Sequence, residues 1–87
     1  MKMMIAILRD MDSDPVTREL TAGHFRVTRI ASTGGLLHRG VTTLLVGMDD
    51  GQVDAAIQVL KDTCSPAPES EKRATVFVVP VEKFEQV

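Results

Sequence analysis

The sequence has little cysteine, few aromatic residues and no dominant sign of charge. Its one cysteine, Cys64, can form neither an internal disulfide nor a thiolate metal cage, which fits a reducing compartment. Three Phe, with no Trp or Tyr, leave almost no stacking platforms for single-stranded nucleic acid. The net charge is only −2, so binding of DNA or RNA through a broad basic surface is not expected.

Long apolar runs are missing as well. The longest near the N-terminus is the six-residue run Met3–Leu8, whereas a signal-peptide core needs roughly 7–15 apolar residues and a membrane helix about 20. The chain of 87 residues contains no visible linker or repeat. It is therefore predicted to be a soluble, cytoplasmic protein with one domain spanning residues 1–87.

The first third of the chain predicts a strand followed by a helix. Met3–Leu8 is apolar on both faces, as expected of a central strand. Asp14 is a suitable helix N-cap, Pro15 a suitable first helical residue and Gly23 a suitable stop. The acidic residues in 10–14 are interpreted as helix capping and a solvated surface. A divalent cation site is the alternative, although their spacing matches no calcium loop.

A second strand is predicted over residues 24–32, where side chains alternate between two faces. Phe25 and Val27 are expected to face the helices. Arg26 and Thr28 then project from the opposite face of the sheet, which must be polar, solvated or packed on another subunit.

The rest of the chain predicts a strand, a helix and a final strand. Val41–Met48 is the third strand, and residues 49–52 read as the start of a helix. The loop 65–73 is polar and contains proline, and Pro80 near the end of the β-branched run Ala74–Val81 predicts an edge strand. An apolar stripe of helical period identifies the second helix and includes the cysteine as a small core residue: Val53, Ala56, Ile57, Leu60 and Cys64.

The order strand–helix–strand–strand–helix–strand predicts an α+β, ferredoxin-like fold, a four-stranded antiparallel sheet with both helices on one face. Strands 1 and 3 are expected at the centre of the sheet. The face without helices is too apolar to remain in water, which favours a closed oligomer formed through that face. Its expected residues are Arg26, Thr28, Thr43, Leu45, Phe77 and Val79.

The sequence contains none of the common catalytic patterns. Nucleophile-elbow, Walker and Rossmann motifs are missing. His24 and His38 lie fourteen residues apart with no cysteine pair beside them. No enzyme activity, metal or cofactor is therefore expected.

The segment 32–37 is the most informative part of the chain for function. Gly34 and Gly35 can take positive φ angles, approach a ligand closely and form an anion-binding nest of N–H groups. Arg26, in the strand leading into this segment, suits a phosphate or an adenine plane, and Thr28 adds a hydroxyl. These are the parts of a nucleotide site; an ordinary turn between strands is the alternative.

Several separated segments together resemble the PII-like cyclic di-AMP receptor family. The resemblance spans nearly the whole chain and implies a homotrimeric, ferredoxin-like signal-transduction protein rather than an enzyme. It also implies cyclic di-AMP binding in clefts between subunits, with loops that reorder and alter a contact to a downstream protein. The matching segments are residues 1–7, 25–28, 31–35, 42–45, 74–81 and 84–86.

The resemblance also implies a set of ligand-binding positions. Arg26 and Thr28 match strand positions beside the adenine, and Gly47 matches a small residue that leaves space for the base. Phe77 and Gln86 match C-terminal positions that close the pocket. The full set is Arg26, Thr28, Gly35, Leu36, Leu37, Val41, Gly47, Phe77 and Gln86.

Three departures from the family pattern bear on the ligand. Leu36 stands where the family usually has Phe, Val41 stands where it has Asn, and the region between Cys64 and Ala74 is short. A lost stacking contact and a lost hydrogen bond together cost about 2–6 kcal/mol. The alternatives are therefore a trimer that binds another nucleotide or small anionic metabolite, and a ligand-free protein that docks a partner through loops 33–40 and 65–73.

Overall fold

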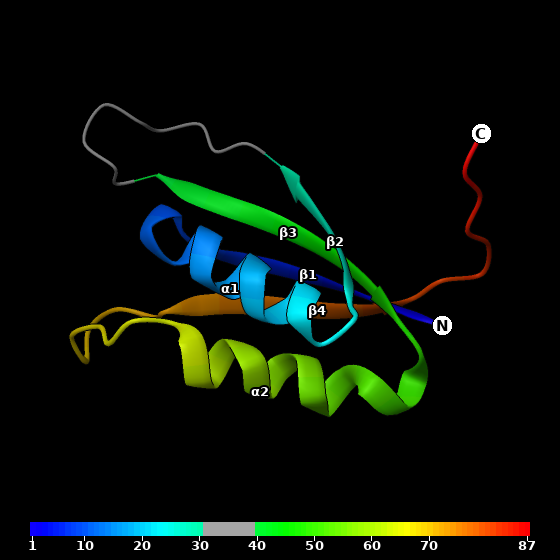
Figure 1. Ribbon diagram of the computed structural model, residues 1–87. Coiled ribbons are helices and arrows are strands. Elements are labelled where there is room, and N and C mark those ends of the chain that lie inside the picture. The colour runs from blue at the N-terminus through cyan, green and yellow to red at the C-terminus, as the bar shows by residue number, and fades with distance from the viewer. Residues whose placement is uncertain (31–39) are drawn as a thin grey trace.

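The computed structural model describes residues 1–30 and 40–87, which form two layers, a sheet and a pair of helices (Figure 1). The strands are antiparallel and lie in the order β2-β3-β1-β4. This is the predicted ferredoxin-like arrangement, with β1 and β3 at the centre. In chain order the elements are β1 (Lys2–Arg9), α1 (Asp10–Ala22), β2 (Arg26–Ile30), β3 (Val41–Met48), the 3-10 turn η2 (Asp50–Gln52), α2 (Val53–Thr63) and β4 (Ala74–Pro80).

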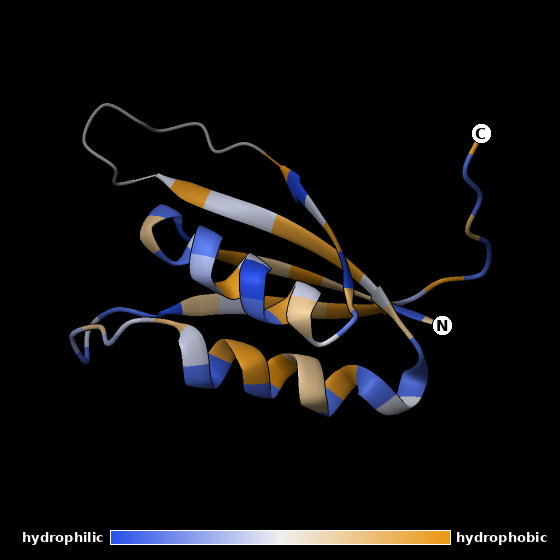
Figure 2. Ribbon diagram, in the orientation of Figure 1, coloured by the Kyte–Doolittle hydropathy of each residue, from blue (hydrophilic) through white to orange (hydrophobic). Residues whose placement is uncertain are grey.

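The core lies between the helices and one face of the sheet. Burial alternates along β1 and β3, so every second side chain enters the core. In Figure 2 the apolar residues of α2 recur on the side toward the sheet. Cys64 is buried there as predicted, and burial raises the pKa of its thiol. The buried apolar residues are Met4, Ala6, Leu8, Val16, Leu20, Leu44, Val46, Met48, Ala56, Leu60 and Cys64.

The start of α1 differs from the prediction. The helix begins at Asp10, directly after β1, so Asp14 is not its N-cap and Pro15 lies inside it. Tertiary contacts explain the earlier start: buried Asp12 accepts the Ser65 N–H, and the Asp14 carboxylate pairs with an arginine of β2. The predicted end of the helix at Gly23 is confirmed.

The start of β2 is also corrected. The strand begins at Arg26 rather than at His24, because His24 has a φ of 69°. That left-handed backbone conformation cannot continue a strand. The last two residues of the predicted strand, 31 and 32, lie outside the described residues.

The later elements follow the prediction closely. β3 spans Val41–Met48 as predicted, and β4 lies at the sheet edge and ends at Pro80. The helix start at residues 49–52 is a capping box, in which the Asp49 N–H donates to the Gln52 side chain at 2.9 Å.

Candidate functional site

The open face of the sheet carries two neighbouring rows of side chains. Strand register places Arg26, Gly47, Met3 and Val79 side by side across β2, β3, β1 and β4. The next row toward the middle of the sheet is Thr28, Leu45, Ile5 and Phe77. The predicted sharing of this face by Arg26, Thr28, Leu45, Phe77 and Val79 is therefore confirmed.

A cleft of about 940 Å³ lies over the first of these rows. This volume is within the range of sites that hold a nucleotide-sized molecule. Its walls come from the turn after α1, the strands, the 3-10 turn before α2 and the C-terminal segment. The lining residues of the sheet are Met3, Arg26, Thr28, Leu45, Gly47, Met48, Val79 and Pro80, and those outside it are Met1, His24, Phe25, Asp49, Gln52, Val81, Glu82, Lys83, Phe84 and Gln86.

Gly47 opens the middle of the cleft. It lies between Arg26 and Met3 in the row, and a Cβ built on it meets no atom within 4 Å. The backbone of β3 therefore does not need glycine to fold. The missing side chain instead leaves room where a flat group can approach the sheet.

One arginine that lines the cleft has no side-chain partner among the residues that the structure describes. Among residues 1–30 and 40–87, Arg26 makes no ion pair or side-chain hydrogen bond, and it is exposed. Lys83 adds a second cation, while Asp49 and Glu82 add two carboxylates. Arg26 is thus available to bind an anion or stack on a planar ring.

The C-terminal segment forms one wall of the cleft. The Val81 N–H donates to the Met1 carbonyl at 3.1 Å, which ties the end of β4 to the start of β1. Beyond this point the chain leaves the sheet close to the N-terminus (Figure 1). Lys83, Phe84 and Gln86 of this segment line the cleft.

The structure brings together four of the predicted site residues and separates two others. Arg26, Thr28, Gly47 and Gln86 line the cleft. Phe77 lies on the same face, in the row next to that of Arg26, but does not line the cleft. Val41 lies at the other end of β3, about 20 Å from Gly47 along the strand. Their roles in binding stay predictions, and the predicted positions Gly35, Leu36 and Leu37 lie outside the described residues.

Sequence reasoning missed several lining residues. Met3 shares a row with Arg26 only through the register of β1 and β3, and His24 and Phe25 enter the cleft from the turn after α1. The alternation of side chains along β1 could have predicted that Met3 lies on this face. Nothing in the local sequence placed Glu82, Lys83 and Phe84 beside the sheet.

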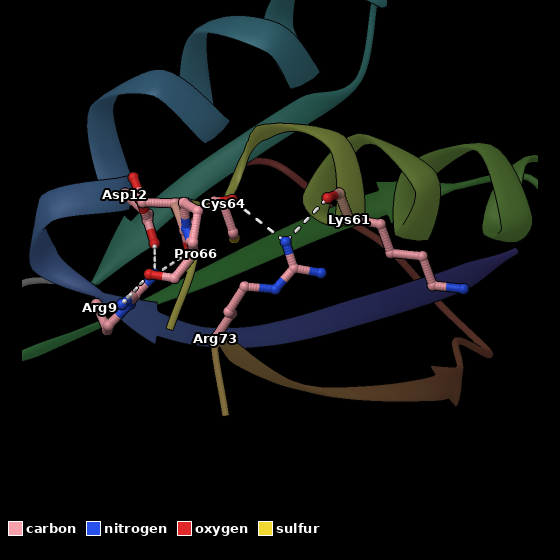
Figure 3. A network of polar contacts seen from close by, with 7 residues as sticks. Arg9, Asp12, Lys61, Cys64, Pro66 and Arg73 are labelled. Atoms are coloured by element: carbon pink, nitrogen blue, oxygen red, sulfur yellow. Dashed lines mark hydrogen bonds and ion pairs between the residues drawn. The ribbon is translucent and has the colours of Figure 1, made fainter. Parts of the chain in front are cut away.

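A separate polar network lies at the opposite end of β1 (Figure 3). The Arg9 guanidinium donates to the Asp12 carboxylate at 2.9 Å, to the Ser65 carbonyl and to the Pro66 carbonyl at 3.3 Å. The Ser65 N–H donates to the Asp12 carboxylate at 3.0 Å. Burial alone would raise the pKa of Asp12, but the hydrogen bonds from Ser65 and Arg9 hold this pKa below its usual value.

This network anchors the segment after α2. In the described part of the chain, no three His, Cys, Asp or Glu side chains gather closely enough to hold a metal ion. Neither described helix is long and apolar enough to span a bilayer.

Comparison with known proteins links the chain to a protein family and to a solved structure. A family model described as cyclic-di-AMP receptor matches residues 1–70. The chain is also similar to a crystal structure described as a functionally unknown protein from Pediococcus pentosaceus ATCC 25745. That match has a TM-score of 0.80 and 28% identity, and it covers 99% of this chain and 96% of the other.

Proposed function

Because this chain belongs to the cyclic-di-AMP receptor family, we propose that it is a PII-like signalling protein that binds cyclic di-AMP in the cleft of the open face. The observation that carries the proposal is the row formed by Arg26 and Gly47, in which a cation that pairs with no described residue lies beside a gap in the sheet surface. Binding would be read out by a downstream protein rather than by a chemical reaction.

The chemistry of the cleft suits the parts of this ligand. The guanidinium of Arg26 can hold a phosphate through two parallel hydrogen bonds, and the Thr28 hydroxyl can donate to the same group. The gap over Gly47 admits the edge of an adenine. Met3 and Leu45 provide apolar surface for the base, and Gln86 adds an amide at the rim.

We propose that the active form is a homotrimer assembled through the open face. Phe77 is 54% exposed, and Ile5 and Leu45 of the same row are only partly covered. An exposed apolar sheet face of this kind favours association. The cleft lies at the border of this face, so a second copy would close it from the side that is open in one chain.

Calorimetric titration with cyclic di-AMP tests the ligand. We expect saturable heat for the wild type and at least a hundredfold loss of affinity for Arg26→Ala, because a charge-assisted pair with phosphate is removed (about 3 kcal/mol). Arg18→Ala is the matched control, since Arg18 is exposed on α1 away from the cleft. An Arg26→Ala protein that binds like the wild type would contradict this site.

One observation favours a second candidate, a different small anionic ligand. The cleft contains the carboxylates of Asp49 and Glu82 as well as two cations, so one chain offers a doubly charged ligand little net attraction. Thermal-shift measurements with cyclic di-AMP, ATP and ADP separate the two candidates. Stabilisation by a mononucleotide alone would support the second.

A further inference from the structure

We infer that the groove between α2 and β4 docks an extended acidic segment of a partner protein through one bulky apolar side chain. The groove has a volume of about 280 Å³ and lies on the helix side of the sheet, opposite the open face. Its lining residues are Ile57, Leu60, Lys61, Cys64, Lys72, Arg73, Ala74 and Val76. The inference does not depend on what fills the cleft.

The charged side chains that line the groove have one sign. Lys61, Lys72 and Arg73 line it, and no carboxylate does, although the whole chain carries a net charge of −2. Within the described ranges, neither lysine takes part in an ion pair. An occupant with negative charge on both sides of its apolar group therefore complements this surface.

One of the three cations, Arg73, is held in place by the fold. Arg73 donates to the Lys61 carbonyl at 3.1 Å and to the Cys64 carbonyl at 3.3 Å, which are main-chain groups at the end of α2 (Figure 3). Ser65 and Pro66, which follow α2, are tied to the end of β1 through Arg9. The groove is thus formed before an occupant arrives, which lowers the entropic cost of binding.

The size and position of the groove favour a peptide over a small molecule. Its volume is below that of typical small-molecule pockets but is enough for one large side chain. β4 is an edge strand, so its outer main-chain groups have no strand partner among residues 1–30 and 40–87. An extended segment can hydrogen-bond along this edge while one side chain enters the groove between Leu60 and Val76.

The test is an NMR titration of the ¹⁵N-labelled full chain with a blocked five-residue peptide that has a central Phe flanked by two Glu on each side. We expect saturable shifts of the Ile57, Leu60 and Val76 amide signals at peptide concentrations up to about 1 mM. The same peptide with Ser in place of Phe, or with Lys in place of Glu, should leave these signals unchanged.

Protein variants identify the contribution of charge. Lys72→Glu and Lys61→Glu should each weaken peptide binding about two- to fivefold at low salt, and both together about tenfold. Arg18→Glu makes the same charge change at an exposed site on α1 and should have no effect. Absence of shifts at the groove, equal binding of the Lys peptide, or undiminished binding by the double variant would overturn the inference.

Discussion

At the scale of single residues, two arginines of β2 show how strand alternation separates structural and binding roles. Arg29 faces the helices, donates to the Ser13 hydroxyl at 3.0 Å and pairs with Asp14. The hydrogen bond from Arg29 is the main reason that the pKa of Asp14 lies below its usual value. Arg26, on the other face, lines the cleft. The same residue type therefore ties the layers together at one position and is offered to a ligand at the other.

Replacing Gly47 should change stability and binding in opposite directions. Gly47→Ala is expected to stabilise the fold by about 0.5–1 kcal/mol, because glycine within a strand is entropically unfavourable and the added Cβ meets no atom. The same methyl group fills the gap beside Arg26, so affinity for cyclic di-AMP should fall. Urea denaturation and calorimetry measure the two effects, and unchanged affinity would place the base elsewhere.

The Asp12 network predicts a pH-dependent contribution to stability. The pKa of Asp12 is lower in the folded chain than its ordinary value of 3.8, so the folded state favours the carboxylate. Its contribution is full above the unfolded pKa and is lost as the pH falls through the folded pKa. Asp12→Asn should cost about 1–3 kcal/mol at pH 7.

Urea denaturation of wild type and Asp12→Asn from pH 7 to pH 2 checks this expectation. The difference between the two proteins should be constant near neutrality and shrink below pH 3.8. A difference that stays the same across this range would mean that the charge of Asp12 does not matter.

At the scale of elements, α1 follows β1 without a connecting loop. Arg9 ends the strand and Asp10 begins the helix, so the first turn is held by tertiary contacts instead of a side-chain cap. The Asp10 N–H donates to the Gly40 carbonyl at 3.1 Å, and the Thr42 hydroxyl donates to the Asp10 carboxylate. β3 therefore contributes to the start of a helix that lies more than thirty residues earlier in the chain.

Substitution of Pro15 tests where α1 begins. Because Pro15 lies inside the helix and lacks an N–H, the Met11 carbonyl cannot accept the usual hydrogen bond. Pro15→Ala should restore this bond and raise the free energy of unfolding by about 1–3 kcal/mol. A helix that began at Pro15 would gain nothing, because proline is favourable at the first helical position. Chemical denaturation distinguishes these outcomes.

At the scale of the whole molecule, the two helices cover only one face of the sheet. The core is closed on that side. The open face presents Phe77, which lies at the end of a row of partly exposed side chains. The cleft lies on the open face and the α2–β4 groove on the helix side. Assembly through the open face would therefore leave the groove accessible.

The proposed trimer predicts the effect of a charge on the open face. Phe77→Glu should reduce the particle from three chains to one chain of 9.5 kDa while the protein stays folded, because this side chain is outside the core. Met11→Glu, at an exposed apolar residue of α1, should leave the trimer intact. Light scattering with circular dichroism measures both properties. A wild-type protein of 9.5 kDa in dilute buffer would contradict the trimer.

Sequence patterns predicted most of the elements but only part of the cleft. The strand Val41–Met48 and the apolar stripe of α2 through Leu60 could be predicted, because burial of one face imposes a period on neighbouring residues. The start of α1 could not be predicted. Asp14 and Pro15 indicate a helix that begins there, but contacts that Arg9 makes with residues far along the chain favour an earlier start.

The order of the strands and helices, the alternation of faces and the core stripe were determined by the sequence alone, because each depends on residues only a few positions apart. The cleft was decided by tertiary structure. Arg26, Gly47, Met3 and Val79 come from four strands, and only the register of the sheet aligns them. The C-terminal segment is joined to the start of the chain by a main-chain hydrogen bond from Val81 to Met1, which no local pattern specifies.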